Sequence, residues 1–129
     1  MALPVPRPVM NEYTLIESTT SIATTPVAAS AIAPVAGYVH RVMAGATGTT
    51  TGTITVAVSI NGGSDIANST LTIAAATGAR AGTVVELPLV GAGTTSGVYI
   101  NEGDVVTFTP SGGTGASIGG AFALVIRAI

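Results

Sequence analysis

The stretch Thr53-Ile-Thr-Val-Ala-Val-Ser-Ile-Asn-Gly62 decides the fold class of this chain. Its aliphatic residues occupy every second position and alternate with Thr, Ala and Ser, which is the pattern of a strand with one buried face. The stretch ends in Asn61-Gly62, a dipeptide that accepts the positive φ angles of a tight hairpin turn. We therefore predict a β-hairpin whose return strand spans about Ile66–Ala74, with Leu71 and Ile73 pointing inward.

Similar alternation recurs on both sides of this hairpin, broken by Gly, Pro, Asn and Ser. It predicts strands over Tyr13–Glu17, Gly37–Ala44, Thr83–Val90, Val98–Ile100, Asp104–Thr109 and Ala121–Ile129. Ser21–Ile32 stays open between an edge strand, a bulged strand and a loop because it contains Pro26. Seven or eight short strands with turns between them predict an all-β fold, an antiparallel sandwich or barrel, and we favour a β-sandwich of the jelly-roll type.

The alternation also predicts which side chains share a face of each strand. The predicted sets are Tyr38, His40 and Val42; Val85, Leu87 and Leu89; Val106 and Phe108; and Phe122, Leu124 and Ile126. Pro88 places its strand at a sheet edge or close to the end of the strand.

The length of 129 residues fits a single domain, which we place at residues 13–129. Residues 1–12 carry Pro4, Pro6 and Pro8, and alternate prolines favour an extended N-terminal arm over a helix. Two interpretations of the arm stay open: a disordered tail, or a segment that lies on a neighbouring subunit. Its apolar side chains favour the second, and they are Leu3, Val5, Val9 and Met10.

The composition argues against catalysis. The chain has no Cys, Lys or Trp, a single His, four Arg and six Asp or Glu, with a net charge of −2. Because the four arginines are scattered, we expect no nucleic-acid binding. The long uncharged stretch Ser18–Val39 contains Pro26 and Pro34 and few large aliphatic residues, so we expect no membrane span. We also expect no export signal, because prolines interrupt the N-terminal apolar residues.

Three features could carry chemistry, and each also has a structural interpretation. His40 could join a Ser or Thr and an Asp in a catalytic triad, but a lone His is more often structural, and we predict no catalytic residue. Asp65, or Glu102 with Asp104, could supply oxygen ligands to calcium, but hydrogen bonding within turns is the better explanation, and we predict no metal or cofactor. The glycine-rich segments Ala44–Gly52 and Ser111–Gly120 lack the Lys of a phosphate-binding loop, so we interpret them as loops.

Threonines give the predicted sheet surface a neutral, polar character, and they are Thr47, Thr49, Thr50, Thr51, Thr53 and Thr55. Soluble sheets normally protect their edges with charge. Because little charge is available here, contacts with a partner are one way to cover the edges, and Pro26 and Pro88 are another.

Four segments, in this order, resemble the small virion proteins of tailed bacteriophages that decorate or cement the head shell. They are Gly37-Tyr-Val-His-Arg-Val-Met, Gly52-Thr-Ile-Thr-Val-Ala-Val-Ser-Ile-Asn-Gly, Asn101-Glu-Gly-Asp-Val-Val-Thr-Phe-Thr and Ala121-Phe-Ala-Leu-Val-Ile-Arg. The resemblance covers about Gly37–Arg127 and leaves out the proline-rich arm. It implies a β-sandwich or jelly roll that sits as a dimer or trimer over joints between major capsid subunits, and it brings no catalytic motif.

The resulting prediction is a non-enzymatic structural protein on the outer surface of a phage capsid, made in the host cytoplasm. Its expected partners are the major capsid protein and further copies of itself, as a dimer or trimer. The predicted contact residues are Leu3, Val5, Arg7, Val9, Met10, Arg41, Thr49, Thr50 and Thr51. The alternative is a carbohydrate- or receptor-binding module of a tail fibre or spike, for which only Tyr13, Tyr38 and Tyr99 offer rings to stack on a sugar.

Overall fold

The computed structural model describes residues 12–75, 82–87 and 98–128. Within these ranges every regular element is a strand, which confirms the predicted all-β class. The strands are β1 (Glu12–Thr19), β2 (Ala29–Ile32), β3 (Gly37–Ala46), β4 (Ile54–Ile60), β5 (Leu71–Ile73), β6 (Gly82–Glu86), β7 (Tyr99–Ile100), β8 (Val105–Ser111) and β9 (Gly120–Ala128). The described ranges contain no helix that could cross a membrane.

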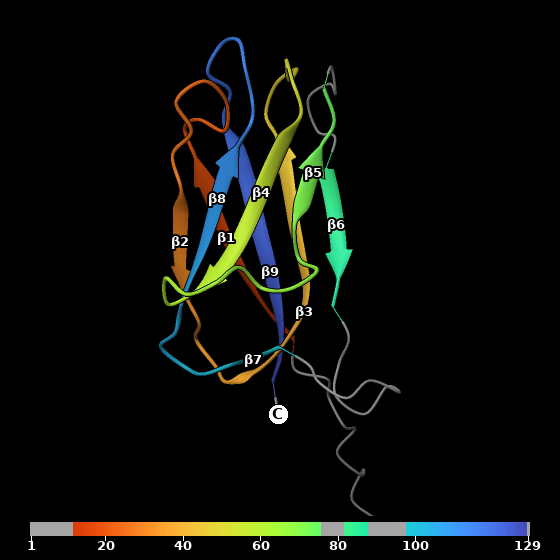
Figure 1. The fold of residues 1–129 in the computed structure, drawn as a ribbon. Coiled ribbons are helices and arrows are strands. Elements are labelled where there is room, and N and C mark those ends of the chain that lie inside the picture. The colour runs from red at the N-terminus through yellow and green to blue at the C-terminus, as the bar shows by residue number, and fades with distance from the viewer. Residues whose placement is uncertain (1–11, 76–81, 88–97, 129) are drawn as a thin grey trace, which may run out of the picture.

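Two antiparallel sheets pack against each other, as predicted for a sandwich (Figure 1). The five-stranded sheet has the order β1-β9-β3-β6, and β7 also pairs with β3. The four-stranded sheet has the order β2-β8-β4-β5. In Figure 1, β8 and β4 cross in front of β9 and β1, and buried residues of both layers form a common core.

The strand pairs are nested along the chain. β4 pairs with β5, β3 with β6, β2 with β8 and β1 with β9. Each successive pair encloses the previous one in sequence, and neighbouring pairs alternate between the two sheets. The pair β4–β5, which encloses the turn at Asn61-Gly62, is therefore the innermost pair of the fold.

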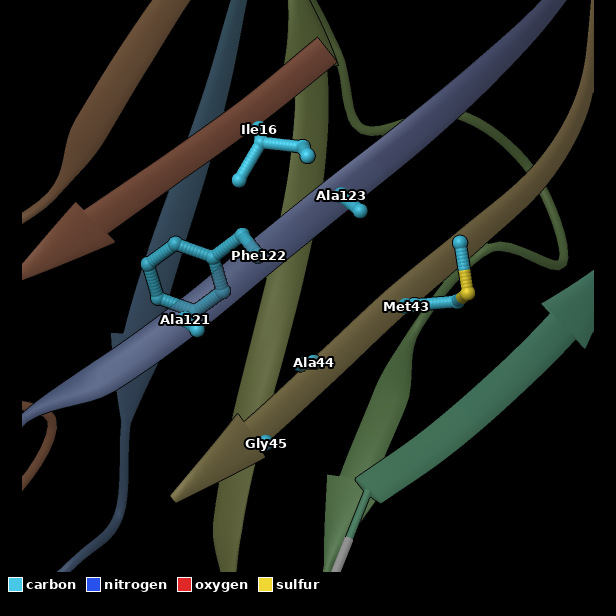
Figure 2. A pocket seen from close by; sticks show the side chains of 7 residues that line it. All are labelled: Ile16, Met43, Ala44, Gly45, Ala121, Phe122 and Ala123. Atoms are coloured by element: carbon cyan, nitrogen blue, oxygen red, sulfur yellow. The ribbon is translucent and has the colours of Figure 1, made fainter. Parts of the chain in front are cut away.

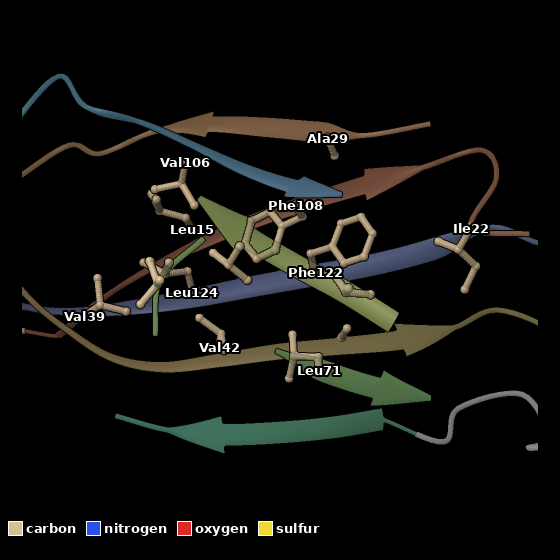
Figure 3. Close-up of a cluster of buried hydrophobic side chains, with 14 of the residues drawn as sticks. Leu15, Ile22, Ala29, Val39, Val42, Leu71, Val106, Phe108, Phe122 and Leu124 are labelled. Carbon is tan, nitrogen blue, oxygen red and sulfur yellow. The ribbon is translucent and has the colours of Figure 1, made fainter. Parts of the chain in front are cut away.

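The core lies between the sheets and has the two phenylalanines at its centre (Figure 3). Phe108 of β8 stacks on Phe122 of β9, with the ring centroids 5.1 Å apart and the planes at 5°. The inward faces predicted from alternation are confirmed by burial of Ile54, Val56, Val58, Leu71, Ile73, Val106, Phe108, Phe122, Leu124 and Ile126. The two stacked rings join the sheets in a core whose other buried side chains are Leu, Ile, Val and Ala.

The predicted face of β3 was wrong because the strand contains a bulge. Val39 pairs with Ile126 of β9, but the next paired residue is Arg41, so His40 is an extra residue in the ladder. A bulge shifts the alternation by one position. Val39 and Val42 are therefore fully buried, whereas Tyr38 and His40 are half-buried. The carbonyl of His40 accepts a hydrogen bond from the N–H of Leu87, with N···O 2.7 Å.

The return strand of the hairpin is shorter than predicted. The turn itself is confirmed, since Asn61 and Gly62 have φ angles of 54° and 68° and the N–H of Gly63 donates to the Ile60 carbonyl. After the bridge between Ser59 and Asp65 the chain leaves the sheet, and β5 begins only at Leu71. The interruption includes Asn68, whose φ of 59° lies in the left-handed region that interrupts a strand.

Several other element boundaries differ from the predicted ones. Glu12, predicted as the end of the arm, is the first residue of β1, and residues 1–11 lie outside the described ranges. The open segment Ser21–Ile32 is a connection followed by the edge strand β2. β6 is an edge strand as predicted, with Leu87 buried behind it, whereas Leu89 lies outside the described residues.

Candidate functional site

The candidate site is the outer face of the five-stranded sheet. Paired residues of adjacent strands share a face, so this face can be described as rows of residues that cross the strands. At one end, a row across four strands contains Glu12, Arg127, Tyr38 and Tyr99. Arg127 Nη2 lies 3.6 Å from Glu12 Oε2. The rings of Tyr38 and Tyr99 meet edge to face at 5.4 Å. This end of the face is polar and aromatic.

The next row is also ionic. It contains Thr14, Val125, Arg41 and Glu86, and Arg41 Nη2 lies 3.7 Å from Glu86 Oε1. Both partners are substantially exposed, so the ion pair contributes little to stability. The same Arg41 nitrogen lies 3.3 Å from His40 Nε2. Within the described residues no Ser, Thr or Asp side chain hydrogen-bonds to the His40 ring, so the geometry of a catalytic triad is not formed there.

The third and fourth rows of this face differ from the first two in charge. Ile16, Ala123, Met43 and Val84 form the third row, and Ser18, Ala121, Gly45 and Gly82 form the fourth. None of these residues is charged, and Ile16 and Val84 are 72% and 56% exposed. We call this surface the uncharged strip, defined by Ile16, Met43, Gly45, Val84, Ala121 and Ala123.

The uncharged strip contains a shallow hollow of about 290 Å³ (Figure 2). Its floor consists of small residues of β9 and β3, namely Ala121, Ala123, Ala44 and Gly45, and of Phe122. Ile16 of β1 and Met43 of β3 stand on either side of the floor. Among the described residues, those that line the hollow are apolar or glycine, so the hollow can accept an apolar group.

The acidic residues considered as cation ligands lie in turns: Glu102 and Asp104 directly precede β8, and Asp65 follows the Asn61-Gly62 turn. Asp104 accepts hydrogen bonds from Asn61 Nδ2 at 2.9 Å and from the N–H of Asn101 at 2.8 Å. Asn61 Oδ1 in turn accepts from the N–H of Val105 at 2.8 Å. The hydrogen bond from Asn61, followed by that from Asn101, lowers the pKa of Asp104 below its usual value of 3.8. The part of the chain that the structure describes contains no group of three or more His, Asp or Glu arranged to hold a metal ion.

The predicted contact residues are scattered. Arg41 lies on the same face as the uncharged strip, paired with Glu86. Thr49 and Thr51 are exposed, whereas Thr50 is buried and donates a hydrogen bond to the Ala74 carbonyl at 2.9 Å. Leu3, Val5, Arg7, Val9 and Met10 lie outside the described residues.

The sequence interpretation missed the members of the uncharged strip. They come from four strands that are distant in sequence, and only the register between those strands places them in two adjacent rows. One signal was present: Leu15 is the apolar core residue of β1, so the alternation leaves Ile16 on the outside.

A scan against protein-family models and searches of curated proteins and of solved structures found no significant match. The function is therefore inferred from the fold and from this surface.

Proposed function

We propose that this chain is a structural virion protein of a tailed bacteriophage that decorates and cements the head shell. It binds the lattice of the major capsid protein on the outer surface of the capsid and performs no catalysis. One observation carries the proposal: the sandwich presents a broad sheet face on which exposed apolar side chains surround a hollow without reactive groups. Exposed apolar patches of this kind mark protein–protein contact sites.

We further propose that the sandwich is a jelly roll. In a jelly roll, two Greek keys place eight strands in two sheets. The nested pairs β1–β9, β2–β8, β3–β6 and β4–β5, distributed alternately over two sheets, support this topology, with β7 as a short addition. Jelly rolls occur in viral capsid domains and in lectins, so the topology is compatible with the proposal and with its alternative.

Cementing acts by mass action. A protein that binds the assembled shell but not the free capsid subunits stabilises the shell by RT ln(1 + [L]/Kd) per site, about 2.7 kcal/mol at a hundredfold excess over Kd. The uncharged strip suits such a role because burying it carries no penalty for desolvating charge. The ionic rows beside it, with Arg41–Glu86 and Arg127–Glu12, can fix the orientation on the lattice.

The proposal is tested by adding purified protein to particles grown without it and measuring binding by co-sedimentation. Ala123→Glu places a charge on the floor of the hollow, and burying it against the shell should weaken binding at least tenfold. Ala57→Glu is the matched control, because Ala57 is a half-buried residue of β4 in the other sheet. Equal binding by both variants, or no binding by the parent protein, would contradict the proposal.

A carbohydrate- or receptor-binding module is the second candidate, and the tyrosine pair favours it. Tyr99 is 43% exposed, and its edge-to-face contact with Tyr38 holds a ring at the surface beside the ion pair of Arg127. A glycan array that detects a ligand, together with loss of that signal in Tyr99→Ala, would support this function over cementing.

A further inference from the structure

We propose that two copies of this chain pair through the free edges of their β1 strands, antiparallel, with Ile16 opposite the partner's Ile16. The two five-stranded sheets then become one continuous sheet. This inference deepens the proposed function and rests on it, because it names the surface through which the decoration protein associates with itself.

β1 offers the longest strand at a sheet end for pairing with a second copy. β1 lies at the end of its sheet and has eight residues, whereas the other strands at sheet ends, β2, β5 and β6, have four, three and five. β1 contains no proline, and its register with β9 runs without a bulge from Glu12 to Thr19. Proteins usually shorten, bend or charge such an edge, because its unpaired N–H and C=O groups recruit other strands. β1 carries Glu12 and Glu17, but it is neither short nor interrupted. A second β1 strand would satisfy these groups.

Most of the large exposed apolar side chains lie on or near β1 and β2. Of the seven large exposed hydrophobic residues in the described ranges, five lie on β1, on the β1–β2 connection, on β2 or on its neighbour β8: Tyr13, Ile16, Val27, Ile32 and Val105. β2 contacts β1 from the opposite sheet. Exposed large apolar side chains are therefore more numerous on β1, β2 and the segments next to them than on β5 and β6.

The register between two paired β1 strands decides which of their side chains meet. Directly opposed residues in an antiparallel pair share a face, so the outward Ile16 has to meet an outward residue. A two-fold axis at Ile16 sets the two Ile16 side chains against each other and places Glu17 opposite Leu15 and Glu12 opposite Thr20. An axis at Glu17 would oppose two like charges, and an axis at Leu15 would set Ile16 against Thr14. The arrangement centred on Ile16 is self-complementary, which a two-fold contact requires.

The pairing also extends the proposed docking surface. Ile16 is the member of the uncharged strip that lies on the edge strand β1. Joining two Ile16 side chains makes the strips of both copies continuous across the axis. Four strands in the main path of each copy give a joined sheet of eight, within the usual size of open sheets. Each protein dimer would then present two hollows on one surface.

The absence of Cys from the chain allows a direct test with single-cysteine variants of the full protein. Ile16→Cys should cross-link into a dimer with a short bis-maleimide reagent, because opposed Cβ atoms in a ladder lie about 4.5–5.5 Å apart. Val84→Cys is the matched control: its side chain is similarly exposed but lies on β6, at the other edge of the same sheet. We expect at least a tenfold higher dimer yield for Ile16→Cys at equal concentration.

The register is tested by mixing two variants. Thr14→Cys and Ser18→Cys should each give little dimer alone but should cross-link with each other, because the axis at Ile16 places Thr14 opposite Ser18. Cross-linking of each alone, or of Val84→Cys in preference to Ile16→Cys, would overturn the inference. So would a parent protein that light scattering finds monomeric at the concentrations of the assay.

The outcomes separate this inference from the proposed function. A monomer that binds capsids overturns the pairing and leaves cementing intact. A β1-paired dimer that does not bind capsids leaves the pairing intact and overturns cementing.

Discussion

Gly37 occupies a position in which no other residue fits. It begins β3 and pairs with Ala128 of β9 on one side and with Ile100 of β7 on the other. A Cβ atom at this position would overlap the carbonyl group of Arg127, which belongs to the backbone and cannot rotate away. The close approach of β3 and β9 at this end of the sheet therefore depends on a missing side chain.

Gly37→Ala should destabilise the fold by about 1–3 kcal/mol, the usual cost of forcing an extra carbon into packed structure. Urea unfolding at fixed protein concentration measures the change. Gly48→Ala is the control, because an added Cβ there meets only Ile118 Cγ2 at an ordinary 3.5 Å. Similar unfolding midpoints for the two variants would contradict the account of Gly37.

Asp104 links two turns that are distant in sequence, and its lowered pKa predicts a pH dependence. A carboxyl whose folded-state pKa is lowered stabilises the fold above its unfolded pKa, here near 3.8, and this contribution is lost as the pH falls through the lower folded value. Asp104→Asn should therefore melt at a lower temperature at pH 7, and the difference from the parent should shrink below pH 3.8. Melting curves between pH 2 and pH 7 test this, and a difference that does not change with pH would contradict it.

At the level of strands, alternation was a sufficient guide wherever a strand is regular and has one buried face. β4, β8 and the inward residues Phe122, Leu124 and Ile126 of β9 follow it without exception. β3 does not, because the bulge at His40 moves its buried face by one position and nothing in the residue types announces an extra residue. The early end of pairing after Asp65 was likewise not predicted by alternation, because Asn68 adopts a left-handed φ of 59° between Asp65 and β5.

The stacked pair Phe108 and Phe122 is the main aromatic contact between the described parts of the two sheets, and it predicts the largest effect of a core substitution. Phe108→Ala and Phe122→Ala should each cost about 3–5 kcal/mol. Because the rings stack on each other, the double variant should lose about 0.5–1.5 kcal/mol less than the sum.

Chemical denaturation of the four proteins gives this cycle. Val105→Ala, on the exposed side of β8, serves as the control and should change stability by less than about 0.5 kcal/mol. Additive losses would show that the two rings do not act as a unit. If either variant fails to fold, Phe108→Leu and Phe122→Leu give the same cycle with smaller losses.

For the whole molecule, alternation predicted the fold class and composition showed a shortage of reactive groups, but neither could locate the candidate site. The uncharged strip is a product of register: Ile16, Met43 and Ala123 belong to strands that only the folded sheet brings together. Thr49, Thr50 and Thr51 are adjacent in the sequence and were predicted together as contacts, whereas in the fold Thr50 is buried and donates a hydrogen bond to the Ala74 carbonyl. When the residues of a surface belong to several strands, no single sequence segment contains enough of them to predict that surface.

We propose that this protein is a cementing subunit of a phage head, and electron cryo-microscopy of virions grown with and without it tests that proposal most directly. We expect a small β-sandwich at fixed positions on the outer shell, with the uncharged strip against the capsid lattice, and shells that rupture more readily when the protein is missing. Shells of unchanged robustness without it, or density for the protein only on the tail, would contradict the claim.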